Sequence, residues 1–165
     1  MIRTVPGDPY ACLVCLHFSA TRPAVREALL QVDATLTQAG TPQELRTRTQ
    51  IALAEACNNI VEHAYGPHTA RGDHAIRLDI GGDRAGLQIT LRDFGRAMPD
   101  GVLPRGALPP IDPADAQSWP EGGFGWALLR KTTHALSVSR HRGQNILRFR
   151  LPRAEKPDTF EGNAM

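Results

Sequence analysis

The sequence lacks the features that define several classes of protein. Its three cysteines are too few, and odd in number, for a disulfide framework, which indicates a reduced, cytoplasmic environment. Aromatic residues make up only 5%, too few for a surface that stacks bases. Lys and Arg number 19 against 17 Asp and Glu, so the net charge of +2 does not favour direct binding to nucleic acid. No apolar run approaches the roughly 20 residues that span a bilayer, so we expect no contact with a membrane.

What the sequence does contain is typical of one globular domain. Its 165 residues, 41% hydrophobic and 22% charged, are enough to bury about 70% of the unfolded surface. We expect a single domain over residues 1–153 and a loose tail over 154–165, which is polar and has no pattern. Residues 96–120 show no regular period, and prolines crowd there at positions 99, 104, 109, 110, 113 and 120. An irregular segment of this length is usually a functional lid or a mobile loop.

The first half of the chain predicts two helices after a strand over 10–18. Thr21 and Pro23 open the first helix and Gly40 ends it. The apolar residues of this helix recur on one face: Val25, Leu29, Val32 and Leu36. The second helix begins at Thr41-Pro42-Gln43-Glu44, a pattern typical of a capping box. It runs to about Ala64, where Gly66-Pro67 stops it.

The second half predicts two hairpins and a third helix. Alternating residues over 76–80 and 87–91 form the first hairpin, with its turn at Gly81-Gly82. The third helix covers about 126–133, and the second hairpin turns at Arg142-Gly143. This order is not the βαβ alternation of a parallel sheet. It predicts an α+β fold in two layers, a mostly antiparallel mixed sheet with helices on one face.

The second helix carries four polar side chains whose spacing predicts one shared face: Glu55, Asn59, Glu62 and His63. Glu55 and Asn59 lie within an apolar stretch, so their polar groups need partners. A carboxylate one turn from a carboxamide offers a base and a Mg²⁺ ligand together. A solvated helix face is the alternative interpretation.

Asp93 is a second candidate, because the alternation of its strand places its carboxylate on the inward face at the strand's end. A buried carboxylate must be paired, and the amino group of a purine is one suitable partner. Gly95, two residues on, lets a ring approach the backbone. The alternative is an Asx turn, which is common at Asp-x-Gly sequences.

A third candidate is the run Gly122-Gly123-Phe124-Gly125, immediately before the third helix. Backbone N–H groups at a helix N-terminus favour an anion such as phosphate. The run has neither the P-loop spacing nor the Rossmann fingerprint, and a plain turn is the alternative.

In combination, these motifs resemble the GHKL (Bergerat-fold) ATP-binding family. They follow one another in order: helical Glu-x₃-Asn, strand-end Asp-x-Gly, a long loop, and Gly-x-Gly at a helix start. The stretch 55–65, EACNNIVEHAY, is most similar to its anti-sigma-factor serine-protein kinases (RsbW/SpoIIAB-like). The resemblance covers about residues 43–151.

The resemblance implies a role for each motif. Glu55 would be the catalytic base, Asn59 the Mg²⁺ ligand and Asp93 the partner of the adenine amino group, with residues 96–120 as the ATP lid. The remaining residues implied to line the nucleotide site are Glu62, His63, Gly95, Gly122, Gly123, Phe124 and Gly125. The implied activity is MgATP-dependent phosphorylation of a serine on a STAS-type anti-anti-sigma factor. The implied partners also include a sigma factor, which the chain sequesters, and a second copy in a homodimer.

The sequence also departs from the family pattern and leaves alternatives open. Ala97 stands where the adenine motif has a second glycine, and Arg105 is a candidate for the γ-phosphate contact in a proline-rich lid. A regulator that binds ATP without phosphorylating a partner is one alternative. The catalytic half of a histidine kinase is another. Cys12 and Cys15 form C-x-x-C, but on a strand they are expected to point to opposite faces, without a second pair for zinc.

Overall fold

A computed structural model describes residues 11–66, 74–104 and 124–153. The predicted tail over 154–165 lies outside the described residues. The strands are β1 Ala11–Ser19, β2 Ala75–Asp83, β3 Gly86–Asp93, β4 His134–His141 and β5 Gln144–Pro152. The helices are α1 Arg22–Gln38, α2 Gln43–Asn59 and α3 Phe124–Thr132, with a π-helical segment η1 Ile60–Tyr65 and a 3₁₀ turn η2 Pro99–Gly101.

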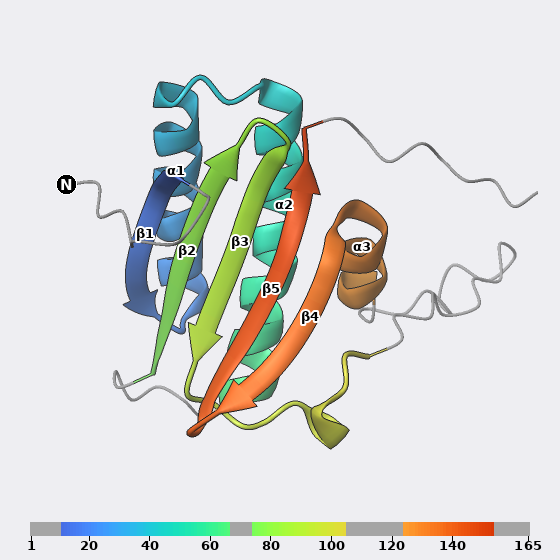
Figure 1. The fold of residues 1–165 in the computed structure, drawn as a ribbon. Coiled ribbons are helices and arrows are strands. Elements are labelled where there is room, and N and C mark those ends of the chain that lie inside the picture. Colours follow the sequence, from blue (N-terminus) through green and yellow to red (C-terminus); the bar gives the residue numbers. More distant parts are fainter. Residues whose placement is uncertain (1–10, 67–73, 105–123, 154–165) are drawn as a thin grey trace, which may run out of the picture.

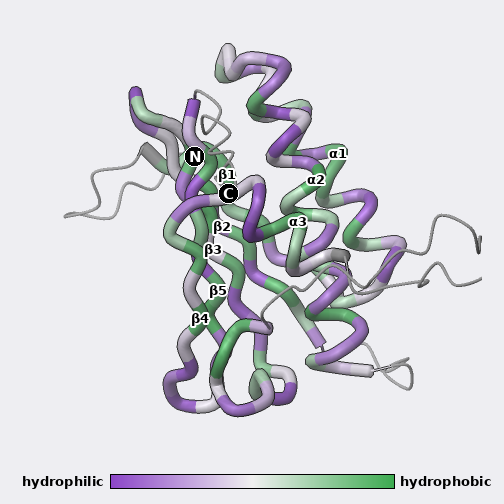
Figure 2. The backbone as a smooth tube through the Cα atoms, turned by 90° about the vertical axis from the view of Figure 1, so that its right-hand side faces the viewer, coloured by the Kyte–Doolittle hydropathy of each residue, from purple (hydrophilic) through white to green (hydrophobic). Residues whose placement is uncertain are grey.

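The strands form one sheet in the order β1-β2-β3-β5-β4, and each of these pairings is antiparallel. The helices cover one face of the sheet (Figure 1) and form a second layer behind it (Figure 2). The predicted α+β two-layer fold is therefore confirmed. Among the described residues, no helix is long and apolar enough to cross a membrane.

The core lies between the two layers because the strands and helices have the predicted periodicities. On the strands, alternate residues are buried, and fully buried examples are Ile76, Leu78, Ile80, Ile89, Leu91, Phe149 and Leu151. On α1, Val25, Val32 and Leu36 are buried against them. Thr21 caps α1 as predicted, since its side chain accepts a hydrogen bond from the backbone N of Ala24.

The predicted capping box of α2 is wrong. The N-cap residue is Pro42, and it makes no side-chain cap hydrogen bond. Thr41 lies one residue too early for the cap position, and its backbone N donates to Leu36 O (2.9 Å) to close the turn after α1. Gly40 adopts the left-handed φ of +70° that this turn needs.

The first hairpin is confirmed, but its predicted turn at Gly81-Gly82 is wrong. Gly81 and Gly82 lie inside β2, paired with Gln88 and Leu87. The turn follows Asp83, whose Oδ1 accepts from the backbone N of Ala85 (2.8 Å) and Gly86 (2.9 Å). A Cβ added to Gly82 would lie 2.6 Å from Leu13 Cδ1, so this glycine serves packing rather than the turn.

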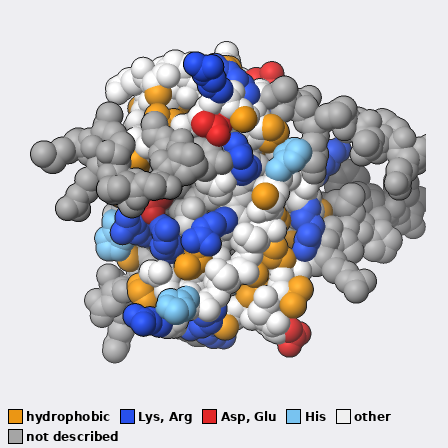
Figure 3. Space-filling view, in the orientation of Figure 1, with side chains coloured by type: hydrophobic (Ala, Val, Ile, Leu, Met, Phe, Trp, Pro, Cys, Tyr) orange, Lys and Arg blue, Asp and Glu red, His pale blue; other side chains and the backbone are white. Residues whose placement is uncertain are grey.

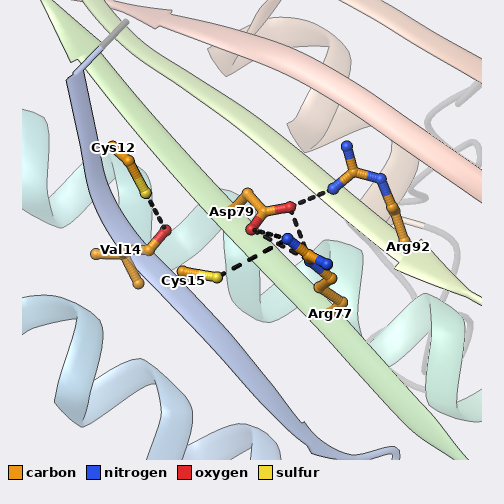
Figure 4. A network of polar contacts seen from close by, with 6 residues as sticks. All are labelled: Cys12, Val14, Cys15, Arg77, Asp79 and Arg92. Carbon is orange, nitrogen blue, oxygen red and sulfur yellow. Dashed lines mark hydrogen bonds and ion pairs between the residues drawn. The ribbon is translucent and has the colours of Figure 1, made fainter. Parts of the chain in front are cut away.

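The prediction that Cys12 and Cys15 face opposite ways is also wrong. A β-bulge after Cys12 adds one residue to β1, so Cys12 pairs with Gly81 and Cys15 with Asp79. Because Gly81 and Asp79 are two residues apart on β2, both thiols lie on the open face of the sheet. Figure 4 shows this face, with Asp79 bound to Arg77 and Arg92 and with Cys15 beside Arg77. The described residues contain no cluster of three metal-ligating side chains.

Basic side chains gather across the same open face (Figure 3). Arg77 lies opposite Arg92 in the register, while Arg148 and Arg150 on β5 lie opposite Thr90 and Gln88 on β3. Arg150 pairs with Asp83. This arrangement agrees with the alternation of the strands, which directs charged residues away from the helices.

Candidate functional site

Two polar side chains of α2 meet the first turn of α3. Glu55 and Asn59 lie one helical turn apart. A Cβ added to Gly125 would lie 2.6 Å from Glu55 Oε2 and 3.5 Å from Asn59 Nδ2. The absence of a side chain at Gly125 therefore lets the carboxylate and the carboxamide lie directly against α3.

The chemistry of this contact is that of an incomplete polar site. Asn59 Nδ2 is buried and has no hydrogen-bond acceptor among the described residues. A buried amide without a partner costs about 1–3 kcal/mol, so a native site of this kind is suited to a ligand that completes it. The N-terminal end of α3 carries partial positive charge, which favours Glu55 and any other anion there.

Asp93 ends β3 with its carboxylate buried, at 4% exposure. Its Oδ1 accepts from the backbone N of Gly95 (2.8 Å) and from Asn145 Nδ2 (2.8 Å). No described residue donates to Oδ2. The first contact is an Asx turn, the alternative that the Asp-x-Gly sequence predicts for this residue. It occupies one carboxylate oxygen, and among the described residues the other oxygen has no donor.

Burial raises the pKa of Asp93 above its ordinary value. The hydrogen bonds from Asn145 and Gly95 and the charge of Arg140 act in the opposite direction and lower the pKa. The carboxylate is thus held by neighbours that favour its ionised form against the cost of burial.

Gly95 lies in close contact with the end of the second helical segment. A Cβ added to it would lie 2.6 Å from Ala64 Cβ and 2.7 Å from Ala64 O. Arg96 N donates to the same carbonyl (2.8 Å), and Phe94 N donates to Tyr65 Oη (3.0 Å). The glycine therefore lets the loop after β3 pack against η1. The prediction that it admits a ring to the backbone stays a prediction.

These contacts also connect the two halves of the site. Asn59 is the last residue of α2, and Ala64 follows within the η1 segment that continues it. Five helical residues span about 7 Å along the axis. The Glu55–Asn59 pair and the Asp93 loop therefore lie along one continuous helical segment, at the same end of the sheet (Figure 1).

The structure does not bring all four polar residues of the second helix to one face. Glu62 binds Arg22 at the start of α1 (Oε1 to Nη2, 2.7 Å), on the side of α2 away from α3 (Figure 1). His63 is exposed. Both follow Asn59 within η1, where i→i+5 hydrogen bonding changes the angular position of each side chain. The prediction of one shared face is therefore wrong for Glu62.

Parts of the predicted phosphate region fall outside the described residues, namely Gly122, Gly123 and the segment 105–120 with Arg105. Phe124 begins α3 and Gly125 follows in its first turn. The described start of the predicted lid, residues 96–104, contains η2 and ends beside α3. There Arg130 donates to the carbonyls of Leu103 (3.2 Å) and Pro104 (3.0 Å).

Sequence reasoning missed Asn145 and Arg140, which surround Asp93. Asn145 is in register with Asp93 across the β3–β5 pair. A signal for it exists in the sequence, because it shares the inward phase of Leu147, Phe149 and Leu151 and is polar. Arg140 gives no such signal, since its position beside the turn looks like ordinary exposed charge.

Comparison with known proteins shows which family this chain belongs to. The family described as "Histidine kinase-like ATPase domain" matches residues 18–151. Serine/threonine-protein kinase BtrW of Bordetella bronchiseptica is 32% identical over 133 residues, covering 80% of this chain and 88% of that protein. Serine-protein kinase RsbW of Bacillus subtilis is 29% identical over 110 residues, covering 66% of each.

A solved structure has a similar fold. It is that of the RsbU and RsbW domains of Rv1364c from Mycobacterium tuberculosis, with a TM-score of 0.54 and 17% identity. The match covers 87% of this chain and 34% of that one, so this chain corresponds to about a third of the solved protein.

Proposed function

Since the chain belongs to the histidine kinase-like ATPase domain family, we propose that it binds ATP with Mg²⁺ and transfers the γ-phosphoryl group to a serine of a small protein. The observation that carries this proposal is the contact of Glu55 and Asn59 with the first turn of α3. It places a potential base, an amide and a helix N-terminus at one point. These three groups suit phosphoryl transfer, because that reaction depends on positioning and on charge stabilisation.

The donor set fits magnesium. Mg²⁺ prefers oxygen ligands and usually takes one or two from the protein, with phosphates and waters completing the octahedron. The side chain of Asn59 offers one such oxygen. Its buried Nδ2 has no acceptor among the described residues, so no protein hydrogen bond from Nδ2 fixes the amide in another orientation. When bound, the ion would supply positive charge that neutralises the phosphates.

Each of these residues has a separate role in the proposed reaction. Asp93 Oδ2 accepts a hydrogen bond from the adenine amino group, and the N-terminal amides of α3 bind the phosphates. Glu55 accepts the proton of the serine hydroxyl as its oxygen forms the bond to the γ-phosphorus. The bond between that phosphorus and the bridging oxygen breaks, and ADP leaves with the electron pair.

The partners follow from the resemblance and from the relatives. Two proteins similar to this chain are named serine-protein kinases. We propose a STAS-type anti-anti-sigma factor as the phosphate acceptor and a sigma factor as the sequestered partner, in a partner-switching cycle. We further propose that the chain acts as a homodimer and in the cytoplasm, where a sigma factor works.

The direct test is transfer of label from γ-³²P-ATP to recombinant STAS-domain proteins by the wild type and by Glu55→Gln. Loss of a positioned base typically costs 10²- to 10⁴-fold in rate. We expect Glu55→Gln to lose about that much transfer while its ATP affinity, measured by calorimetry, stays within about threefold.

The matched control is Glu44→Gln, the same change at the exposed start of α2. It should leave both quantities unchanged. Transfer by Glu55→Gln at the wild-type rate would remove Glu55 from the role of base. ATP binding by the wild type without any transfer would favour the alternative, a regulator that binds ATP but does not phosphorylate.

A further inference from the structure

Two residues of the β4–β5 hairpin form hydrogen bonds to Asp93 and to the loop that follows it. Arg140 on β4 and Asn145 on β5 are cross-strand neighbours. Arg140 Nη1 donates to Gly95 O (3.0 Å) and to Asn145 Oδ1. Asn145 Nδ2 in turn donates to Asp93 Oδ1 (2.8 Å) and to Arg96 O (2.9 Å). A single arginine thus reaches the loop directly and through the asparagine.

We propose that Arg140 is a positioning residue for nucleotide recognition. It fixes Asn145 and the Gly95 carbonyl so that Asp93 presents its second carboxylate oxygen to the amino group of adenine. This inference rests on the proposed function, because it requires that ATP binds at Asp93.

The reason lies in the two ends of the asparagine side chain. An amide can point either its oxygen or its NH₂ group toward a neighbour. Arg140 is a donor only, so its bond to Asn145 Oδ1 turns that oxygen toward β4. The NH₂ group must then face Asp93 Oδ1. Asp93 Oδ1 and Arg96 O hold the same orientation from the other side. Without Arg140, Asn145 Oδ1 and Gly95 O would lose the donor that ties them to β4, and the loop that carries Asp93 would be held less firmly.

Arg140 also acts through its charge. Among the charged and titratable groups around Asp93, Arg140 faces it from β4, and its positive charge lowers the pKa that burial raises. Tyr65 lies near it from η1 as a neutral phenol. The neighbours in register are the uncharged Asn145 on β5 and the apolar Ile76 on β2. Arg140 is therefore the cation that favours ionised Asp93 among the described residues.

The test compares Arg140→Met, which removes charge and donors, with Arg140→Lys, which keeps the charge. Loss of one such hydrogen-bonded contact is worth about 1–2 kcal/mol, so Arg140→Met should bind ATP roughly tenfold more weakly at neutral pH. As the pH is lowered, the ATP affinity of Arg140→Met should begin to fall at a higher pH than that of the wild type, because Asp93 takes up its proton earlier. Arg140→Lys should keep the wild-type pH profile with an intermediate affinity.

The matched control is Arg148→Met, because Arg148 is exposed on the open face of the sheet and loses the same charge. It should match the wild type in ATP affinity and in pH profile. Weaker binding of equal size in Arg148→Met would mean that net charge, not position, is responsible. An unchanged pH profile in a folded Arg140→Met would mean a merely structural role. Either result would overturn the inference.

A second measurement separates this inference from the proposed function. The pKa of the Asp93 carboxyl can be followed by ¹³C NMR without nucleotide, and it should rise in Arg140→Met but not in Arg148→Met. A wild type that does not bind ATP would contradict the proposed function. An Asp93 pKa that is the same in Arg140→Met and the wild type would contradict the role of Arg140, whether or not ATP binds.

Discussion

At the scale of single residues, the candidate site consists of groups whose hydrogen-bonding capacity the fold leaves open. Asn59 has a buried amide without a described acceptor, and Asp93 uses one carboxylate oxygen within the protein while no described residue donates to the other. The sequence indicates both residues, because a polar residue in an apolar phase needs a partner. The sequence marks Asn145 as a polar residue in an inward phase, but it does not show that Asn145 pairs with Asp93, which lies 52 residues earlier.

Asp93→Asn is the sharpest change at this scale. The amide keeps an oxygen for Gly95 N and Asn145 but replaces a charged acceptor at Oδ2. A hydrogen bond to a charged group contributes about 1.5–3 kcal/mol, so ATP affinity should fall roughly 10- to 100-fold and the preference over GTP should shrink. Calorimetric titration with both nucleotides measures this. Equal ATP affinity of variant and wild type would leave Asp93 as a turn residue.

The stability of the same variant should also depend on pH differently from that of the wild type. Burial raises the pKa of folded Asp93 above the ordinary 3.8, so the wild type loses stability as the pH rises through the interval above 3.8. Asp93→Asn does not titrate there. The melting temperature of the variant minus that of the wild type should therefore increase as the pH rises above 3.8. Below pH 3.8 this difference should be smallest. A variant less stable at pH 7 than at pH 3, relative to wild type, would contradict this.

At the scale of elements, the informative feature is the change from α2 to the π-helical η1. Six residues, Ile60–Tyr65, continue the helix with a different hydrogen-bond pattern. Within this segment, Glu62 forms an ion pair with Arg22, and Ala64 packs closely against Gly95. The sequence predicted a helix to about Ala64 and its stop at Gly66, but hydrophobic periodicity over so few residues does not distinguish α from π winding.

Turns and bulges show the same limit. Gly81-Gly82 looked like a turn, yet Asp83 forms it, because its carboxylate binds two backbone N–H groups while Gly82 makes room for Leu13. The bulge in β1 has no signature in the local sequence. By contrast, the turn at Arg142-Gly143 was predicted correctly. There both residues have positive φ, 49° and 81°, as a two-residue hairpin requires.

Gly95→Ala tests the contact between η1 and the loop after β3. Its Cβ would lie 2.7 Å from the backbone oxygen of Ala64, which cannot move without displacing η1. Overpacking of this kind costs about 1–3 kcal/mol. We expect that loss of unfolding free energy in urea denaturation, and weaker ATP binding with it.

Two further variants check this explanation. Ala97→Ser, at an exposed position of the same loop, should change stability by less than about 0.5 kcal/mol. Adding Ala64→Gly to Gly95→Ala removes the contact between Cβ atoms but not the one with the carbonyl, so it should rescue stability only in part. Wild-type stability of Gly95→Ala would show that η1 and the loop are not closely packed.

At the scale of the whole molecule, the sequence predicted the layers and the order of the motifs. Alternation on the strands and the helical stripe determine which faces are buried, and these are the strongest patterns in a sequence. The sequence also predicted that residues far apart share one site, through the resemblance of its motifs. The Arg140–Asn145 contacts and the true position of Glu62 depend on the packing of elements, which single-chain periodicity does not contain.

The central claim is that α2, the end of β3 and the start of α3 form one nucleotide pocket. Backbone NMR of the wild type, titrated with Mg²⁺ and a non-hydrolysable ATP analogue, tests it most directly. We predict that the largest shift changes occur together in three segments, 55–59, 93–95 and 124–126. At the opposite end of the sheet, Leu13, Leu45 and Leu87 line a separate cavity of about 190 Å³. Changes confined to that cavity, or none at millimolar analogue, would contradict the account.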